Sequence, residues 1–406
     1  MLIVKKFGGT SVADKDKILN AAKRCAEEWG KGNDVIVVLS AMGDTTDALI
    51  ALARDVNPEG SKREMDMLLT TGEQVSVSLM AMALQSLNVP AVSLNAFQVK
   101  MLGTSRYADA RFKGIDTERI YMELENRKVV VVTGFQAVNK RDDFVTLGRG
   151  GSDTTAVALA AAMRADQCEI YTDVDGIYTA DPRIVKDAKK LNEITYDEML
   201  ELATLGAQVL HNRSVEMAKK YGVELVVRSS MNTAEGTVVK EKANMENMII
   251  TGVAEDKNTA RISLIGLNDR PGMAFKVFNL LAQNHLNIDN ILQSVGRDST
   301  KDITFTLSSS DVKEAVRVLE EKKDSLTIQE ISYSDKVAKV SIVGAGMMSN
   351  PGVASRMFAA LSEAQVNIDM ISTSEIRITV LVDEKDADRA MTAVHDAFAI
   401  DEGIIK

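Results

Sequence analysis

The final third of the chain carries one pattern twice. The first copy reads Ile262–Gly266, Pro271-Gly272 and Asn287-Ile288-Asp289, and the second reads Val340–Gly344, Pro351-Gly352 and Asn367-Ile368-Asp369, with 18 positions from the proline to the aspartate in both. Such a repeat indicates two copies of one supersecondary unit. The order of strand-like and helix-like segments predicts a β-α-β-β-α-β domain for each copy. The strand-like segment Ile249–Val253 precedes the first copy and is a candidate to complete the sheet of the second.

Residues 1 to about 240 alternate short apolar runs with longer amphipathic stretches. The predicted strands are Leu2–Phe7, Val35–Ser40, Ala91–Leu94, Val129–Thr133, Glu169–Thr172 and Val223–Arg228. The predicted helices are Asp14–Trp29, Met65–Leu87, Thr117–Glu125, Asp153–Met163, Tyr196–Leu205 and Asn212–Tyr221. This alternation predicts an α/β domain with a mostly parallel sheet between helices, and ligands beyond the carboxyl ends of its strands. We therefore expect one domain at 1–240 and the repeat domains at 249–335 and 336–406.

Composition narrows the functional classes. The 406 residues carry 48 Lys and Arg against 58 Asp and Glu, and the net charge of −10 argues against nucleic-acid binding. No run approaches the roughly 18 consecutive apolar residues of a membrane span, so no membrane partner is expected. Only two cysteines are present, and the first residues already read as a strand without a leader. Both features favour a cytoplasmic protein.

The first glycine-rich turn suits a phosphate group. Gly8 and Gly9 follow the first predicted strand and allow backbone amides to approach phosphate oxygens closely. The neighbouring Lys6 could neutralise charge on a transferring phosphoryl group. Two glycines also occur in ordinary tight turns, and that remains the alternative.

A second glycine-rich segment, Gly148–Thr155, is more specific. It joins three glycines to Arg149, whose guanidinium can hold a carboxylate through two hydrogen bonds. Ser152 or Asp153 is the natural N-cap of the alanine-rich helix that follows. The alternative is a capped helix without a ligand.

Glu73 lies on the apolar side of its predicted helix, in line with Leu69 and Val77. An unpaired carboxylate is costly in such a place. It therefore needs a cation, and we expect either Lys6 or the ammonium group of a substrate. A purely structural ion pair is the alternative.

Two further loops follow predicted strands. Ser40–Asp47 offers hydroxyls and carboxylates to a small zwitterion, and Thr172–Arg183 offers an aromatic residue and a cation to a nucleotide. The histidines are scattered, no Cys/His spacing supports zinc, and His211 is interpreted as a packing residue. A carboxylate acceptor needs no base in phosphoryl transfer, because it is already ionised at pH 7. The missing base therefore favours a kinase that forms an acyl phosphate.

Together these motifs resemble the aspartate kinase (aspartokinase) family of the amino-acid kinase superfamily. The resemblance is carried by Lys6–Ser11, Ser40–Gly43, Thr71–Glu73, Gly148–Asp153, Thr172–Gly176 and Asp181–Arg183. The two C-terminal copies look like tandem ferredoxin-like ACT domains, which sense amino acids. The resemblance implies ATP-dependent phosphorylation of the L-aspartate side-chain carboxylate to 4-phospho-L-aspartate. That reaction is the first step towards lysine, threonine, methionine and diaminopimelate.

The resemblance also implies roles by position. Lys6 and Glu73 would be catalytic, as a buried pair. The implied substrate-binding residues are Thr45, Glu73, Arg149, Gly150, Gly151 and Ser152. The implied nucleotide-binding residues are Lys6, Phe7, Gly8, Gly9, Ser40, Ser152, Thr172, Asp173, Tyr178, Asp181 and Arg183. Mg²⁺ is expected to enter with ATP, with no protein ligand assigned.

Regulation by lysine, threonine or both is implied at the ACT copies. Free amides at the Pro-Gly helix starts can receive the carboxylate of an amino acid. The implied effector-binding residues are Asp269, Met273, Ala274, Asn287, Ile288, Asp289, Gln293, Asn350, Val353, Asn367, Ile368 and Asp369. Exposed sheet edges suggest pairing across subunits. We expect a homodimer, or a heterotetramer with a shorter regulatory chain that starts at Met245 or Met248.

Two other functions remain open at this point. One is another acyl-phosphate-forming kinase of the same superfamily, such as one that acts on glutamate. The other is a catalytically inactive amino-acid sensor, against which the intact Lys6, Glu73, Arg149 and Asp173 argue.

Overall fold

The computed structural model describes residues 1–206, 209–243, 249–295 and 300–399 of the chain. These residues form two compact units. The first unit contains residues 1–178, 190–204 and 209–243, and the second contains residues 179–189, 205–206, 249–295 and 300–399. The proposed start positions Met245 and Met248 lie outside the described residues.

The first unit is built on an eight-stranded sheet in the order β10-β12-β11-β9-β1-β2-β6-β3. Its strands are β1 (Leu2–Phe7), β2 (Asp34–Leu39), β3 (Ala91–Leu94), β6 (Val129–Thr133), β9 (Gln167–Thr172), β10 (Glu193–Thr195), β11 (Leu225–Ser229) and β12 (Thr237–Lys240). β1 lies in the interior and pairs in parallel with both β2 and β9. The antiparallel pair β11–β12 is the exception, so the predicted mostly parallel sheet is confirmed.

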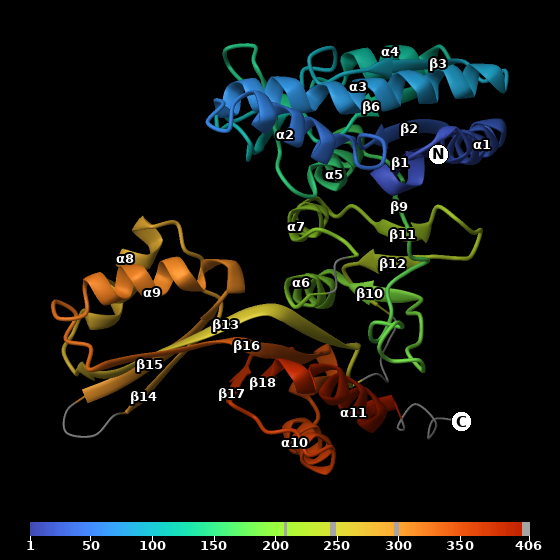
Figure 1. Cartoon of the computed structure of the whole chain (residues 1–406). Helices are drawn as coiled ribbons and strands as arrows, with labels where there is room; N and C mark the ends of the chain where they lie inside the picture. Colours follow the sequence, from blue (N-terminus) through green and yellow to red (C-terminus); the bar gives the residue numbers. More distant parts are fainter. Residues whose placement is uncertain (207–208, 244–248, 296–299, 400–406) are drawn as a thin grey trace. The chain divides into compact units, whose positions relative to one another are not determined.

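Helices cover both faces of this sheet. On one face, α1 (Lys15–Gly30) and α3 (Lys62–Ser86) share a core with alternate residues of β2 and β6, such as Val37 and Val131. Figure 1 shows α3 running alongside β6 and β3. α5 (Gly151–Met163) packs on β1, β2 and β9 from the other face, and most of its side chains are buried. The remaining helices are α2 (Thr45–Val56), α4 (Glu118–Glu125), α6 (Tyr196–Thr204) and α7 (Asn212–Tyr221).

α3 is long and apolar enough to cross a membrane by length and composition alone. Half of its most apolar window is buried inside the unit, as in the core helix of a soluble protein.

The sequence patterns did not predict a second, four-stranded sheet in this unit, in the order β5-β4-β7-β8. Its strands are β4 (Leu102–Gly103), β5 (Phe112–Gly114), β7 (Gln136–Val138) and β8 (Phe144–Thr146). Segments of two or three residues are too short to show a hydrophobic period, which is why they were missed.

The second unit contains one six-stranded antiparallel sheet, in the order β14-β15-β13-β16-β18-β17. Its strands are β13 (Gly252–Asn268), β14 (Ile291–Val295), β15 (Thr300–Leu307), β16 (Glu330–Val343), β17 (Met370–Thr373) and β18 (Arg377–Asp383). Its helices are α8 (Met273–Gln283), α9 (Val312–Glu321), α10 (Val353–Glu363) and α11 (Ala387–Ala399). Gly272 and Gly352 cap α8 and α10 at φ +89° and +93°, a backbone region that favours glycine.

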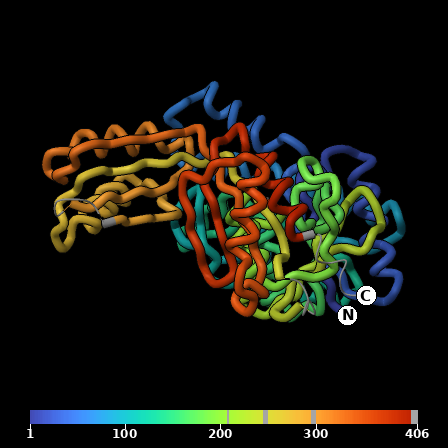
Figure 2. The backbone as a smooth tube through the Cα atoms, turned by 90° about the horizontal axis from the view of Figure 1, so that it is seen from below, coloured from blue at the N-terminus to red at the C-terminus, as the bar shows by residue number. Residues whose placement is uncertain are grey.

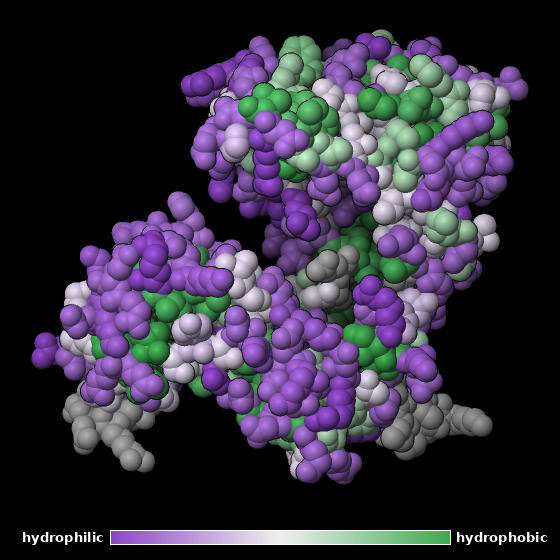
Figure 3. All heavy atoms as spheres, viewed as in Figure 1, coloured by the Kyte–Doolittle hydropathy of each residue, from purple (hydrophilic) through white to green (hydrophobic). Residues whose placement is uncertain are grey.

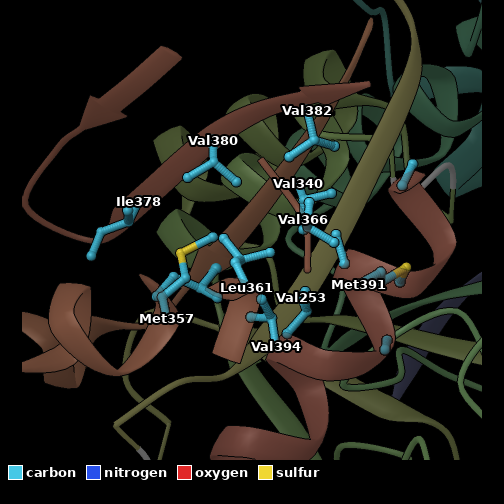
Figure 4. Packing of buried hydrophobic residues seen from close by; sticks show 14 of the residues in the cluster. Val253, Val340, Met357, Leu361, Val366, Ile378, Val380, Val382, Met391 and Val394 are labelled. Carbon is cyan, nitrogen blue, oxygen red and sulfur yellow. The ribbon is translucent and has the colours of Figure 1, made fainter. Parts of the chain in front are cut away.

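The two copies share their longest strands. The start of β13 pairs with the end of β16, and the end of β13 pairs with the start of β16. The strand expected at Ile249–Val253 begins at Gly252 and continues unbroken into the first strand of the first copy. The yellow trace of β13 passes through both copies in Figure 2. Figure 4 shows the consequence: Val253 of β13 lies beside Leu361 of α10 and Val394 of α11, in the core of the second copy.

One segment joins the second unit from an unexpected place in the sequence. Residues 179–189 lie between β9 and β10 of the first unit, yet Ala180 and Val185 are buried in the core of the second copy. The Val253 amide donates a 2.7 Å hydrogen bond to the Thr179 carbonyl. Thr179 Oγ1 lies 2.9 Å from Nε2 of His395 on α11. The chain therefore leaves the first unit after Tyr178 and returns at Lys190.

The shared strands predict that a change in β13 weakens the second copy. Val253→Ala removes two buried methyl groups and should cost about 2 kcal/mol of unfolding free energy. Hydrogen–deuterium exchange should accelerate in β18 and stay unchanged in β1. Val56→Ala, at a side chain that is 82% exposed, is the matched control. Unchanged exchange in β18 would contradict the shared core.

Candidate functional site

Lys6 lies at the carboxyl end of β1 and points to the face covered by α5. Its Nζ is 2.6 Å from Oδ1 of Asp153 in the first turn of α5, and the residue is 9% exposed. The expected Lys6–Glu73 ion pair is therefore wrong. Glu73 belongs to α3, on the opposite face, so the strand alternation directs Lys6 to Asp153 instead. Sequence reasoning had considered Asp153 only as a helix cap.

Glu73 is buried, and only one of its two carboxylate oxygens accepts a hydrogen bond from another residue among those described. Oε1 accepts a 3.1 Å hydrogen bond from the Ala41 amide, and Oε2 has no hydrogen-bond partner among the described residues. Burial raises the pKa of Glu73 to about 7, and the Ala41 hydrogen bond opposes this only in part. No basic side chain in the described part of the chain forms an ion pair with Glu73, which argues against the structural ion pair. The free oxygen suits a cationic group of a ligand.

The loops after β1 and β2 meet the start of α5. The Ser40 hydroxyl donates a 2.9 Å hydrogen bond to the Ser152 hydroxyl, and the Gly43 amide donates a 3.0 Å bond to the Gly9 carbonyl. A Cβ at Gly9 would lie 2.8 Å from the Ala41 carbonyl oxygen, so only glycine permits this approach. Three segments that are distant in sequence therefore converge at one edge of the sheet.

The Gly148–Gly151 loop leads into α5. Gly150, at φ +69°, is the N-cap and supplies no side-chain cap, so the predicted Ser152 or Asp153 cap is wrong. Both side chains lie inside the first turn, where they contact Ser40 and Lys6 instead. Arg149 is exposed and has no ion-pair partner in the described part of the chain, so its guanidinium is available to a carboxylate.

Thr45 and Gly151 complete the implied substrate set. Thr45 begins α2, and its hydroxyl donates a 2.5 Å hydrogen bond to the Met42 carbonyl in the same loop as Ala41. Gly151 is buried, and a Cβ there would lie 3.0 Å from side-chain atoms of Leu147 and Phe135. Both residues lie in the converging segments.

The expected nucleotide-binding residues are divided between the units. Thr172 ends β9, and Asp173 and Tyr178 follow it in the first unit, where the Tyr178 hydroxyl donates a 2.8 Å hydrogen bond to Asp175. Asp181 and Arg183 belong to the second unit and form an ion pair at 2.6 Å.

The structure limits what Phe7 and Gly8 can offer. The Phe7 side chain is fully buried and stacks on Tyr171 at 4.5 Å, so only its main chain could reach a nucleotide. The Gly8 amide already donates to the Tyr171 carbonyl at 3.3 Å.

A second buried charge lies behind Lys6. Lys5, its neighbour on β1, is 2% exposed and bonds to Glu169 of β9, which also accepts from the Tyr171 hydroxyl at 3.0 Å. Burial would lower the pKa of Lys5, but Tyr171 and Glu169 raise it, so the ammonium stays charged. Two adjacent lysines on an interior strand must point to opposite faces, and that signal could have revealed this pair.

Two of the expected effector residues form ion pairs that cross between the copies. Asp289 of the first copy bonds to Lys339 on β16, and Asp369 of the second copy lies 3.1 Å from Arg261 on β13. Each aspartate thus pairs with a basic residue of the other copy.

The other expected effector residues vary in exposure. Asp269 pairs with Lys301 at 3.0 Å, and the Asn350 amide group donates to the Gly346 carbonyl at 2.9 Å. Asn287, Asn367 and Gln293 are exposed, whereas Val353 is buried. The remainder are half-buried: Met273, Ala274, Ile288 and Ile368.

Comparison with known proteins agrees with both parts of this picture. The amino acid kinase family matches residues 1–229, and the ACT domain matches residues 261–325 and 340–398. Aspartokinase 2 of Bacillus subtilis is 50% identical over 400 residues, which cover 98% of each chain. The aspartokinase of Corynebacterium glutamicum is 48% identical over 100% of this chain and 98% of that protein.

Solved structures give the same result. Escherichia coli aspartokinase III in complex with aspartate and ADP is 27% identical, with a TM-score of 0.82, over 98% of this chain and 100% of that one. The same enzyme in complex with lysine and aspartate is 26% identical, with a TM-score of 0.78, over 98% of this chain and 99% of that one. The chain therefore belongs to the aspartokinase family, as an amino acid kinase domain followed by two ACT domains.

Proposed function

We propose that this protein transfers the γ-phosphoryl group of ATP to the side-chain carboxylate of L-aspartate, forming 4-phospho-L-aspartate. The observation that carries the proposal is that the loop after β2 contacts both charged elements: the Ala41 amide bonds to the buried Glu73, and the Ser40 hydroxyl bonds to Ser152, next to the Asp153 that pairs with Lys6. The names of the relatives and the aspartate and ADP bound to E. coli aspartokinase III support it.

The substrate is a zwitterion with one additional carboxylate, and the site offers complementary charges. The free oxygen of Glu73 accepts the substrate ammonium, and the guanidinium of Arg149 holds a carboxylate. Thr45, Gly150, Gly151 and Ser152 enclose the substrate.

The chemistry needs orientation and neutralisation of charge. The acceptor oxygen of aspartate is already ionised at pH 7, so it attacks the γ-phosphorus without a base. A new phosphorus–oxygen bond forms, the bond to the leaving ADP breaks, and no proton is transferred. Lys6 neutralises the charge on the moving phosphoryl oxygens, and Asp153 fixes the position of its ammonium.

The nucleotide binds at the end of β9 and on the loop that follows it, with Thr172, Asp173 and Tyr178 as its contacts in the first unit. Gly9 and Ser40 approach its phosphates, together with the main chain of Phe7 and Gly8. No group of three His, Cys, Asp or Glu side chains among the described residues could hold a metal ion. Mg²⁺ would enter with ATP and, when bound, would offset charge on the phosphate oxygens, with no protein ligand assigned.

The ACT copies make the enzyme responsive to end products of the pathway that begins with aspartyl phosphate. Lysine, threonine or both bind near the Pro-Gly helix starts and favour a less active conformation. The lysine bound to E. coli aspartokinase III supports this regulation. We propose a cytoplasmic homodimer, or a heterotetramer with a shorter regulatory chain.

One coupled experiment separates this proposal from its rivals. Trapping the acyl phosphate with hydroxylamine should give product with aspartate and ATP, and far less with glutamate or acetylglutamate. Preference for another acceptor would indicate a different kinase of the superfamily. No product with any acceptor would indicate an inactive sensor.

Lys6→Ala should lower kcat by about 10²–10³-fold or more, because charge on the moving phosphoryl group is no longer neutralised. Initial rates and circular dichroism should be measured together. Lys31→Ala, at a side chain that is 64% exposed, is the matched control. Near-normal turnover of a folded Lys6→Ala variant would refute the role of Lys6.

The pH dependence of kcat/KM for aspartate should show the ionisation of Glu73. Only the ionised carboxylate holds the substrate ammonium, and its pKa in the free enzyme is about 7. As the pH falls below about 7, protonation should lower kcat/KM for aspartate towards tenfold per pH unit. Glu73→Gln should show a low, flat profile on the acid side. A Glu73→Gln variant that keeps the wild-type acid limb would assign that limb to another group.

Asn287→Ala and Asn367→Ala should weaken inhibition by lysine or threonine at least about tenfold, because each removes an exposed polar group of the proposed effector set, in the loop between its helix and the next strand. Turnover without effector should stay within about twofold of wild type. Asn284→Ala, at another exposed asparagine, is the control. A wild-type enzyme insensitive to both amino acids, singly and combined, would contradict the regulation; wild-type inhibition of both variants would contradict the site.

A further inference from the structure

The start of α7 packs on the loop that carries Arg149. His211 is the N-cap of α7, and its Nδ1 accepts a hydrogen bond from the Arg213 amide at 3.4 Å. This bond fixes the orientation of the imidazole ring. α7 also packs directly against α5.

The His211 ring occupies the space above Gly150. A Cβ at Gly150 would lie 2.2 Å from Cγ and 2.6 Å from Cδ2 of His211, well inside van der Waals contact. The ring therefore lies against the backbone of the residue that follows Arg149. At this position the loop cannot move towards α7.

Arg213 holds the other end of the same loop. Its guanidinium bonds to the carbonyl of Leu147, directly before Gly148, and donates a 2.9 Å hydrogen bond to the Ala110 carbonyl. Asp109 lies 3.5 Å from the same group. The first turn of α7 thus contacts the Gly148–Gly151 loop at both ends.

We propose that His211 is a positioning residue for substrate binding: its ring fixes the backbone at Gly150 and thereby places Arg149 on the substrate carboxylate. The inference rests on the aspartate kinase activity proposed above. Arg149 is exposed and has no ion-pair partner among the described residues, so the loop backbone is the main constraint on its position. Two glycines with positive φ, Gly148 and Gly150, would otherwise make this loop adaptable.

The surroundings of His211 fit a neutral ring. Burial lowers the pKa of His211; the charge of Asp153 opposes this, and the nearby Arg213, Arg149 and Arg111 lower it further. A neutral imidazole adds no positive charge beside Lys6 and leaves Asp153 to pair with that lysine. His211 thus acts through the volume of its ring, which lies on Gly150, and through its N-cap hydrogen bond to the Arg213 amide.

The test uses His211→Asn, which keeps a polar N-cap for the Arg213 amide and removes the ring. KM for aspartate should rise about tenfold, whereas kcat and KM for ATP should stay within about threefold of wild type. Small displacements of a carboxylate-binding group are enough for such an effect. The matched control is His285→Asn, at an exposed histidine in the second unit, which should change none of these values.

A double-mutant cycle isolates the contact. Gly150→Ala should raise KM for aspartate less in a His211→Ala background than in wild type, because the clash with the ring is gone while the backbone strain at positive φ remains. Additive effects of the two changes would refute the contact.

A third measurement does not depend on activity. Hydrogen–deuterium exchange at residues 148–151 should be faster in His211→Asn than in wild type. Wild-type exchange and an unchanged KM for aspartate in a folded His211→Asn variant would overturn the inference. Absence of aspartate phosphorylation in wild type would instead overturn the proposed function, and the exchange result would still decide the role of His211.

Discussion

Successive side chains of a strand point to opposite faces, and β1 uses this to place two adjacent lysines in two environments. Lys5 meets Glu169 on the face covered by α1, and Lys6 meets Asp153 on the face covered by α5. An ammonium group buried without a partner would cost several kcal/mol, so each lysine requires its own carboxylate. The site depends on this division: Lys5 stabilises the strand from behind, and Lys6 is held at the strand end where the loops converge.

Glu73 differs from these lysines: its carboxylate is buried, but no side chain among the described residues forms an ion pair with it. Its pKa of about 7, against an ordinary value of 4.5, corresponds to roughly 3 kcal/mol of unfavourable ionisation in the empty site. An ammonium group at the free oxygen would remove much of this cost. Such a buried carboxylate is kept in place where the surrounding fold is rigid, and the packing of α3 on the sheet supplies that rigidity.

In the second unit, the two strands that contribute to both cores also connect the two copies. β13 and β16 each belong to both copies, and the Asp289–Lys339 and Asp369–Arg261 pairs cross between them. A ligand that displaced one aspartate would leave a basic residue of the other copy unpaired. Residues 179–189, which follow the proposed nucleotide loop, are part of this unit, so a regulatory conformational change has a continuous chain connection to that loop.

The sequence by itself determined the interior strands, the long helices, the repeated βαββαβ pattern and the glycine-rich loops at the strand ends, because hydrophobic periods and glycine turns are local signals. It made Lys6, Glu73 and Arg149 candidates for the site, because a charge in an apolar or glycine-rich setting is visible in a short window. Tertiary structure alone decided that Lys6 pairs with Asp153, that His211 lies on Gly150 and that residues 179–189 join the second unit. The reason is physical: a partner across a sheet or between units is set by how the elements pack, and no local pattern records which of several acidic or apolar neighbours the fold will bring close.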